Sequence, residues 1–199
     1  MLEAAKTRVE NSGVIPKALQ RHANLVETLS EMESEIRLII MGRQGKKSES
    51  TLAQIGSQLE SVIRALHSPI LVSLSTFKVP QKIMIAFDGS PTAFKMLTHL
   101  LKYPQLFEGI ECHLVTIGGE SDSPLQEAKA LLLKEGHESI TARRLSETLE
   151  VGLRNYIKDN HIDLTVMGAY GTSPIRRFIL GSNTTKMLHQ TQVPLLLLR

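Results

Sequence analysis

Apolar and polar residues alternate along the chain in two kinds of run. Short runs of branched apolar residues are typical of buried strands, and longer runs with apolar residues at every third or fourth position are typical of helices. In the second part of the chain the strands are predicted at residues 82–87, 110–117, 139–144, 162–167 and 193–198. This alternation predicts an α/β fold, with a parallel five-stranded open sheet and helices on both faces.

Four helices are expected between these strands, at residues 91–101, 123–135, 147–160 and 183–190. Pro91 suits a first helical turn because proline lacks only an amide that would be unpaired there. The first part of the chain is predicted to hold helices at 2–11, 24–34 and 51–66, and strands at 36–41 and 69–74. Asn24 can cap the second of these helices. Pro16 makes residues 14–21 a weak extended piece, and 76–81 is expected to be a linker.

The first part of the chain repeats the second. Ile36–Gly45 matches Ile162–Gly171, and Gly56-Ser57 matches Gly181-Ser182 after a loop that is one residue longer. The first helix is part of the repeat as well, because Leu2-Glu-Ala-Ala-Lys6 resembles Leu125-Gln-Glu-Ala-Lys129. Two units are therefore predicted: a partial first unit at residues 1–76, without its first two strands, and a complete second unit at residues 81–199.

The partial unit is expected to leave a central strand edge bare. We therefore expect either that residues precede Met1 in the natural protein or that another chain covers this edge.

Composition narrows the possible functions. The 199 residues carry a net charge of +3, with scattered basic residues, no Trp and few other aromatics, so nucleic-acid binding is not supported. A single cysteine, Cys112, rules out an internal disulfide framework. No apolar run is long enough to cross a membrane, and the first residues do not resemble a signal peptide. A cytoplasmic protein is expected.

Glycines and hydroxyl residues follow the strand at 162–167. Gly168 and Gly171 suit a turn, and Gly181-Ser182 suits the start of a helix, where unpaired amides and the helix dipole attract an anion. Such residues are also ordinary in turns and helix caps. Asp88 and Gly168 both come just after a strand, so they are candidates for one crevice at the carboxyl edge of the sheet.

Three stretches together resemble the universal stress protein family. They are the strand that ends in Asp88-Gly-Ser90, the spacing Gly168-x2-Gly171-x9-Gly181-Ser182, and the final Val193-Pro-Leu-Leu-Leu. The resemblance covers residues 82–199 and, in truncated form, residues 1–75, in the manner of tandem members. It implies a sheet with strand order 3-2-1-4-5 and ATP bound between the first and fourth strands.

The resemblance also implies the residues of the site. Asp88 would lie near the adenine, Ala86 and Ile117 would form apolar walls, and Met167 would lie along the ribose. The nucleotide-binding residues implied in this way are Ala86, Phe87, Asp88, Ile117, Met167, Gly168, Gly171, Gly181, Ser182, Asn183 and Thr184. Magnesium could join the phosphates. Family members pair through the last strand, which implies a homodimer or pairing between the two repeats through Leu195–Leu198.

The leading hypothesis is a nucleotide-binding regulatory protein of the stress response that is not an enzyme, because no positioned base or metal cluster is evident. Two alternatives stay open: a slow ATP hydrolase or adenylyl-transferring enzyme, and a ligand-free dimeric scaffold. The first unit retains Gly42, Gly45, Gly56 and Ser57 but has no counterpart of Asp88, so it is expected to hold only a remnant of the site.

Overall fold

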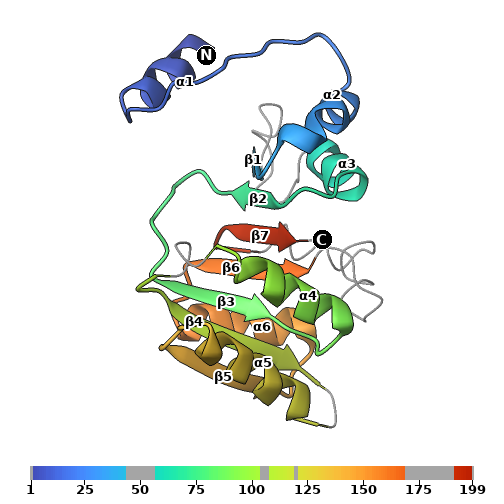
Figure 1. The fold of residues 1–199 in the computed structure, drawn as a ribbon, viewed down its shortest axis with the longest axis vertical. Helices are drawn as coiled ribbons and strands as arrows, with labels where there is room; N and C mark the ends of the chain where they lie inside the picture. The colour runs from blue at the N-terminus through green and yellow to red at the C-terminus, as the bar shows by residue number, and fades with distance from the viewer. Residues whose placement is uncertain (1, 44–56, 104–107, 119–120, 169–190, 199) are drawn as a thin grey trace.

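A seven-stranded sheet runs through both predicted units (Figure 1). The computed structural model describes residues 2–43, 57–103, 108–118, 121–168 and 191–198. The strands are β1 (Ile39–Gly42), β2 (Ile70–Ser73), β3 (Lys82–Ala86), β4 (Glu111–Ile117), β5 (Ile140–Leu145), β6 (Leu164–Gly168) and β7 (Leu195–Leu198). Their order across the sheet is β1-β2-β7-β6-β3-β4-β5.

The second unit has the strand order that the resemblance implied. Its strands lie in the order β5-β4-β3-β6-β7, and each neighbouring pair among them is parallel. Residues 83–86 of β3 are buried one after another, as expected where helices cover both faces of a parallel sheet. The whole sheet differs from the expected five strands because β1 and β2 extend it beyond β7.

The two units join through their last strands. β2 runs antiparallel to β7, with Ile70 opposite Leu197 and Val72 opposite Leu195. Both strands are almost wholly apolar, so neither has charged side chains that would oppose pairing. The pairing expected between the repeats is therefore present within one chain.

Helices cover the two faces of the second unit's sheet. α4 (Pro91–Leu100) and α5 (Ser123–Lys134) lie on one face, and α6 (Leu149–Asp159) lies on the other (Figure 1). The alternation along β3 explains this, because Ile83 and Ile85 pack in the same core cluster as α4 and α5. Met84 and Ala86 point the other way and pack in the cluster that includes α6.

The first unit shares its core with the second. α2 (Leu25–Met32), the short 3-10 helix η1 (Glu33–Glu35) and α3 (Ser57–Ala65) accompany β1 and β2. Asn24 caps α2 as expected, since its side-chain oxygen accepts from the Val26 amide at 2.9 Å. Leu59 and Ile70 belong to the same buried cluster as Leu153 of α6.

The start of the chain lies apart from this core. α1 (Leu2–Glu10) contains no buried residue and lies beyond β1 and α2, at the far end of the molecule (Figure 1). Residues 14–21 form no strand, and Ile15 is 96% exposed. The repeat explains both facts, because α5, the counterpart of α1, packs on β4 and β5, and the first unit has no strand corresponding to β4. No helix in the described part of the chain is long and apolar enough to span a membrane.

Candidate functional site

A tightly fixed aromatic residue, Phe87, follows β3 directly. The Phe87 amide donates to the Val115 carbonyl at 2.8 Å, which extends the pairing with β4 by one residue. The Phe87 ring is buried and meets Phe94 of α4 edge to face, with 5.1 Å between ring centroids. Of the residues predicted for the site, Phe87 thus has its side chain in the core on the α4 face, and its backbone leads to the carboxyl edge of the sheet.

The Asp88-Gly89-Ser90 turn connects β3 to α4. One oxygen of the half-buried Asp88 carboxylate accepts from the Ser90 amide at 3.0 Å. The Ser90 hydroxyl in turn accepts from the Ala93 amide at 3.1 Å and caps α4. Gly89 has a φ of +73°, and a Cβ there would lie 3.0 Å from Pro124. The turn therefore holds a carboxylate at the carboxyl edge of the sheet in a fixed orientation.

β6 places Met167 and Gly168 beside this turn. Ala86 is level with Met167 of β6 on one side and with Val115 of β4 on the other. All three side chains are buried and form a continuous apolar row below the strand ends. Gly168 ends β6 over α4, where a Cβ would lie 3.8 Å from the Met96 sulfur. Ala86, Asp88 and Gly168 are thereby brought to one edge.

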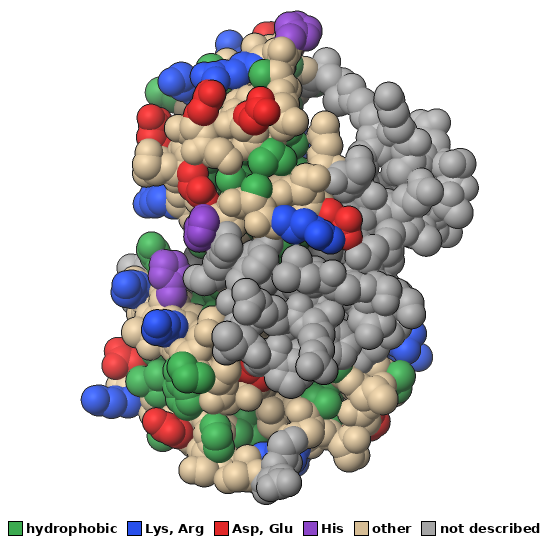
Figure 2. Space-filling view, turned by 90° about the vertical axis from the view of Figure 1, so that its right-hand side faces the viewer, with side chains coloured by type: hydrophobic (Ala, Val, Ile, Leu, Met, Phe, Trp, Pro, Cys, Tyr) green, Lys and Arg blue, Asp and Glu red, His purple; other side chains and the backbone are tan. Residues whose placement is uncertain are grey.

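The strand order reverses between β3 and β6. From β3 the chain crosses to β4 on one side, and from β6 it continues to β7 on the other. Crevices at such switch points, outside the carboxyl ends of parallel strands, are the usual ligand sites of open α/β sheets. Figure 2 faces this edge, and basic side chains lie among acidic ones at both ends of the view. Ile117 ends β4, one strand further along, and is partly buried in the α6 cluster.

Five predicted site residues lie outside the described residues: Gly171, Gly181, Ser182, Asn183 and Thr184. The expected helix at 183–190 lies there too. The described part of the predicted site therefore consists of the ends of β3, β4 and β6.

Two further residues shape this edge, and the sequence reading missed them. Arg144 of β5 donates to the Asp122 carboxylate at 2.5 Å and to the carbonyls of Gly118 and Ser121, so it fixes the segment after β4. Gly152 lets α6 approach the sheet, since a Cβ there would lie 3.4 Å from the side-chain methyl of Ile117. The pairing register of β5 with β4 could have indicated Arg144, because this residue lies level with Thr116 near the end of β4.

The remnant in the first unit is only partly described. Gly42 ends β1, and the Arg43 guanidinium donates to the Thr191 carbonyl at 2.5 Å. Gly45 and Gly56 lie outside the described residues, and so does the side chain of Ser57.

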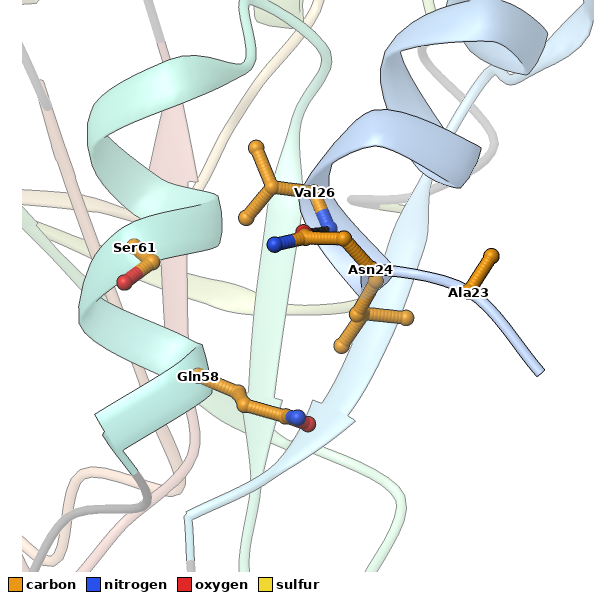
Figure 3. Close-up of a pocket in the computed structure, with 6 residues that line it drawn as sticks. Ala23, Asn24, Val26, Gln58 and Ser61 are labelled. Carbon is orange, nitrogen blue, oxygen red and sulfur yellow. Dashed lines mark hydrogen bonds between the residues drawn. The ribbon is translucent and has the colours of Figure 1, made fainter.

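A small pocket lies between the first turns of α2 and α3 (Figure 3). Its lining residues are Ala23, Asn24, Leu25, Val26, Gln58 and Ser61. None of them is charged, and the Asn24 oxygen already caps α2.

The titratable groups with shifted pKa values lie away from the carboxyl edge where β3 and β6 end. Burial raises the pKa of the Cys112 thiol to about 12, so the thiol is not a ready nucleophile. At the amino end of β4, hydrogen bonds from Lys82 and His113 lower the pKa of Glu111. His113 is buried there and also bonds the Tyr156 hydroxyl at 2.8 Å. Among the described residues, no group of three or more His, Cys, Asp or Glu could hold a metal ion.

Comparison with known proteins points to one family. The model of the universal stress protein family matches residues 114–199. A curated universal stress protein of Synechocystis is 29% identical over 205 residues, which cover all of this chain and 71% of that protein. A crystal structure of a universal stress protein from Archaeoglobus fulgidus is 18% identical with a TM-score of 0.78, covering 100% of this chain and 74% of the other.

A Pseudomonas aeruginosa protein of unknown function has a similar fold. It is 15% identical, with a TM-score of 0.66 and coverage of 99% of this chain and 76% of that chain. At these low identities, the similarity to the two crystal structures supports the fold alone. The A. fulgidus and P. aeruginosa similarities extend over both predicted units.

Proposed function

We propose that this chain, which belongs to the universal stress protein family through the domain matched at residues 114–199, is a nucleotide-binding regulatory protein. Its ligand is ATP, bound in the crevice between the carboxyl ends of β3 and β6. The observation that carries the proposal is the switch in strand order at β3 and β6, which brings Asp88 and Gly168 to one edge.

The described residues suit the two ends of a nucleotide differently. The buried row of Val115, Ala86 and Met167 forms an apolar floor, which suits the flat face of a base. The Asp88 carboxylate stands at its rim and can accept from an exocyclic amine. The glycine and hydroxyl residues from Gly171 to Thr184 are the proposed phosphate ligands, on the sequence argument given above. Magnesium would be held mainly by the phosphates.

Regulation without robust catalysis follows from the chemistry that the described residues offer. Asp88 is the single carboxylate of the Asp88-Gly89-Ser90 turn, and one of its oxygens accepts from the Ser90 amide. Ser90 uses its hydroxyl oxygen to cap α4 by accepting from the Ala93 amide, and within the described part of the chain no histidine hydrogen-bonds this hydroxyl. A general base and an activated nucleophile are the parts that hydrolysis or adenylyl transfer would need. We therefore propose that bound ATP changes the state of a partner or of the oligomer in a stress response.

The test measures ATP binding by thermal shift and by calorimetry. Ligand at a hundred times its Kd is expected to stabilise the folded chain by about 2.7 kcal/mol. Asp88→Ala should abolish most of this gain because it removes the carboxylate and loosens the Ser90 turn. Asp88→Asn keeps an oxygen for the Ser90 amide, so it separates the effect of charge from the effect of the turn. The exposed Asp159→Asn is the matched control.

Measurements on the same purified protein test the two alternative functions. Phosphate release by the wild type that disappears in Asp88→Ala would favour a slow hydrolase. Absence of both copurified nucleotide and any thermal shift with ATP would favour a ligand-free scaffold and overturn the proposal.

A further inference from the structure

Arg144 lies two strands away from the Asp88-Gly89-Ser90 turn, yet a short series of contacts connects the two. β4 lies between β5, which carries Arg144, and β3, which leads into the turn. The contacts run through the first turn of α5, which follows β4 along the chain. α5 packs in the same core cluster as α4, the helix that the Asp88 turn begins.

The Arg144 guanidinium holds three groups around the start of α5. Its Nε donates to the Asp122 carboxylate at 2.5 Å. Its two other nitrogens donate to the carbonyls of Gly118, just after β4, and of Ser121, just before Asp122. Because a guanidinium is planar and presents its donors in a fixed fork, these three acceptors are held in one arrangement. Arg144 therefore fixes where α5 begins relative to the end of β4.

Asp122 forms this ion pair instead of capping its own helix. It occupies the N-cap position of α5, where an aspartate side chain ordinarily accepts from an amide of the first turn. Asp122 makes no such bond, and its carboxylate accepts from Arg144. The Asp122 side chain is 63% exposed, so the ion pair itself adds little to the stability of the whole chain. What the ion pair determines is the position of the first turn of α5.

Pro124, in that first turn, lies against the tip of the Asp88 turn. A Cβ on Gly89 would lie 3.0 Å from the Pro124 Cβ and 3.4 Å from its Cγ. Gly89 connects the two residues of the turn's hydrogen bond, in which the Asp88 carboxylate accepts from the Ser90 amide at 3.0 Å. A shift of Pro124 would therefore move the backbone that carries both the donor and the acceptor of this bond.

We propose that Arg144 is a positioning residue of the candidate nucleotide site. By fixing the first turn of α5 it keeps Pro124 against Gly89, and the turn in consequence keeps the Asp88 carboxylate oriented at the carboxyl edge of the sheet. The effect on ATP rests on the proposed function, and Arg144 acts on it only through the contacts of Asp122 and Pro124.

Hydrogen exchange of the full chain without nucleotide, followed by NMR, tests the positioning directly. Arg144→Lys keeps the charge but loses the fork, and Arg144→Gln loses both. Both variants should speed exchange of the Ser90 amide by about tenfold, because its acceptor on Asp88 is no longer held in place. The Phe87 amide, which bonds β4 directly, is the internal reference and should exchange as in the wild type.

Arg143→Gln is the matched control for these variants. It removes the same charge from the neighbouring residue of β5, which is exposed. Since the fork of Arg144 stays intact, exchange of the Ser90 amide should not change. Thermal unfolding of each variant checks that it is folded.

A double-mutant cycle with Pro124→Gly tests the route of the effect. Pro124→Gly removes the ring atoms that lie against Gly89 and should by itself speed exchange of the Ser90 amide. Adding Arg144→Gln should then cause little further change, because both substitutions act through one contact. Effects that simply add would mean that Arg144 does not act through Pro124, and the proposal would be wrong.

Calorimetry with ATP gives the functional readout. Both Arg144→Lys and Arg144→Gln should raise the Kd by about tenfold, and Arg143→Gln should leave it unchanged. Wild-type affinity in Arg144→Lys would reduce the role of Arg144 to its charge and overturn the proposal, as would unchanged exchange of the Ser90 amide. A wild type that binds no ATP would overturn the proposed function instead, and the exchange measured without nucleotide would still decide whether Arg144 positions the turn.

Discussion

Gly89 holds the turn on which the candidate site depends. Its φ of +73° is a conformation that side-chain-bearing residues adopt at a cost of about 1–2 kcal/mol. A Cβ at this position would also lie 3.0 Å from Pro124. Gly89→Ala is therefore expected to lower the free energy of unfolding by about 2 kcal/mol or more, measured by urea denaturation.

Gly118→Ala provides the comparison for this prediction. Gly118 has a φ of +66°, but a Cβ there would meet nothing within 4 Å. The free energy of unfolding of this variant should fall only by the cost of the positive φ, about 1 kcal/mol. Equal losses for the two variants would show that the contact with Pro124 adds nothing to the constraint at Gly89.

Asp163 is the second residue whose role can be measured, and it fixes the linker to β6. Its carboxylate accepts from Lys78 Nζ and the Gln81 amide at 2.9 Å and from the Lys82 amide at 3.1 Å. Burial opposes the charge, but these hydrogen bonds outweigh it and lower the pKa of the carboxyl group. A pKa that is lower in the folded state contributes stability above the unfolded value, near 3.9, which is lost as the pH falls through the folded value.

Asp163→Asn is therefore expected to reduce the stability at pH 7 by about 1–3 kcal/mol and to flatten the loss of stability in acid. Urea denaturation at a series of pH values measures both effects. Asp159→Asn, at an exposed position on α6, should leave the acid profile unchanged. If the stability of Asp163→Asn fell with decreasing pH in parallel with that of the wild type, the Asp163 carboxylate would not contribute to the loss of stability in acid, and the prediction would be wrong.

At the scale of elements, local signals predicted the fold well where the chain caps or turns itself. Asn24 and Pro91 begin α2 and α4 as the sequence indicated. The predicted strand at 36–41 starts later, at Ile39, because its pairing with β2 begins only there. The turn at Asp88 and its position beside Gly168 were predicted from strand ends alone. The burial of Phe87 against Phe94 was not, since periodicity says nothing of which helix meets a side chain.

α1 shows what a predicted helix lacks when its packing partner is missing. It has nine residues and none is buried, whereas isolated helices shorter than about 12–15 residues are marginal in water. The amides of α1 are therefore expected to exchange with solvent almost without protection, measured by hydrogen exchange on the full chain. Those of α5, which buries Leu125, Ala128 and Leu132, serve as the internal reference. Strong protection of α1 would mean that it packs against other parts of the protein.

At the scale of the molecule, the repeat predicted two units but not that they would fold around one core. Ile39, Leu59 and Ile70 of the first unit are buried in one cluster with Met84 and Leu195 of the second. Periodicity and repeats report the contacts within a unit. The contacts between units depend on the pairing of β2 with β7, which only the resemblance implied.

A shared core predicts cooperative unfolding of the whole chain. Two strands with two helices rarely form a stable domain alone, so the first unit should not outlast the second. Ile70, 3% exposed, lies opposite Leu197 at the joint. Ile70→Ala is expected to cost about 2–5 kcal/mol and to shift unfolding of the entire chain. Hydrogen exchange in β2 and in β4 should report the same decrease in the free energy of unfolding. Ile85→Ala, in the other core cluster, should also lower the stability of both strands equally. A loss confined to β1, β2 and α3 would instead mean that the first unit opens by itself, and the joint would then be a contact between separately stable parts.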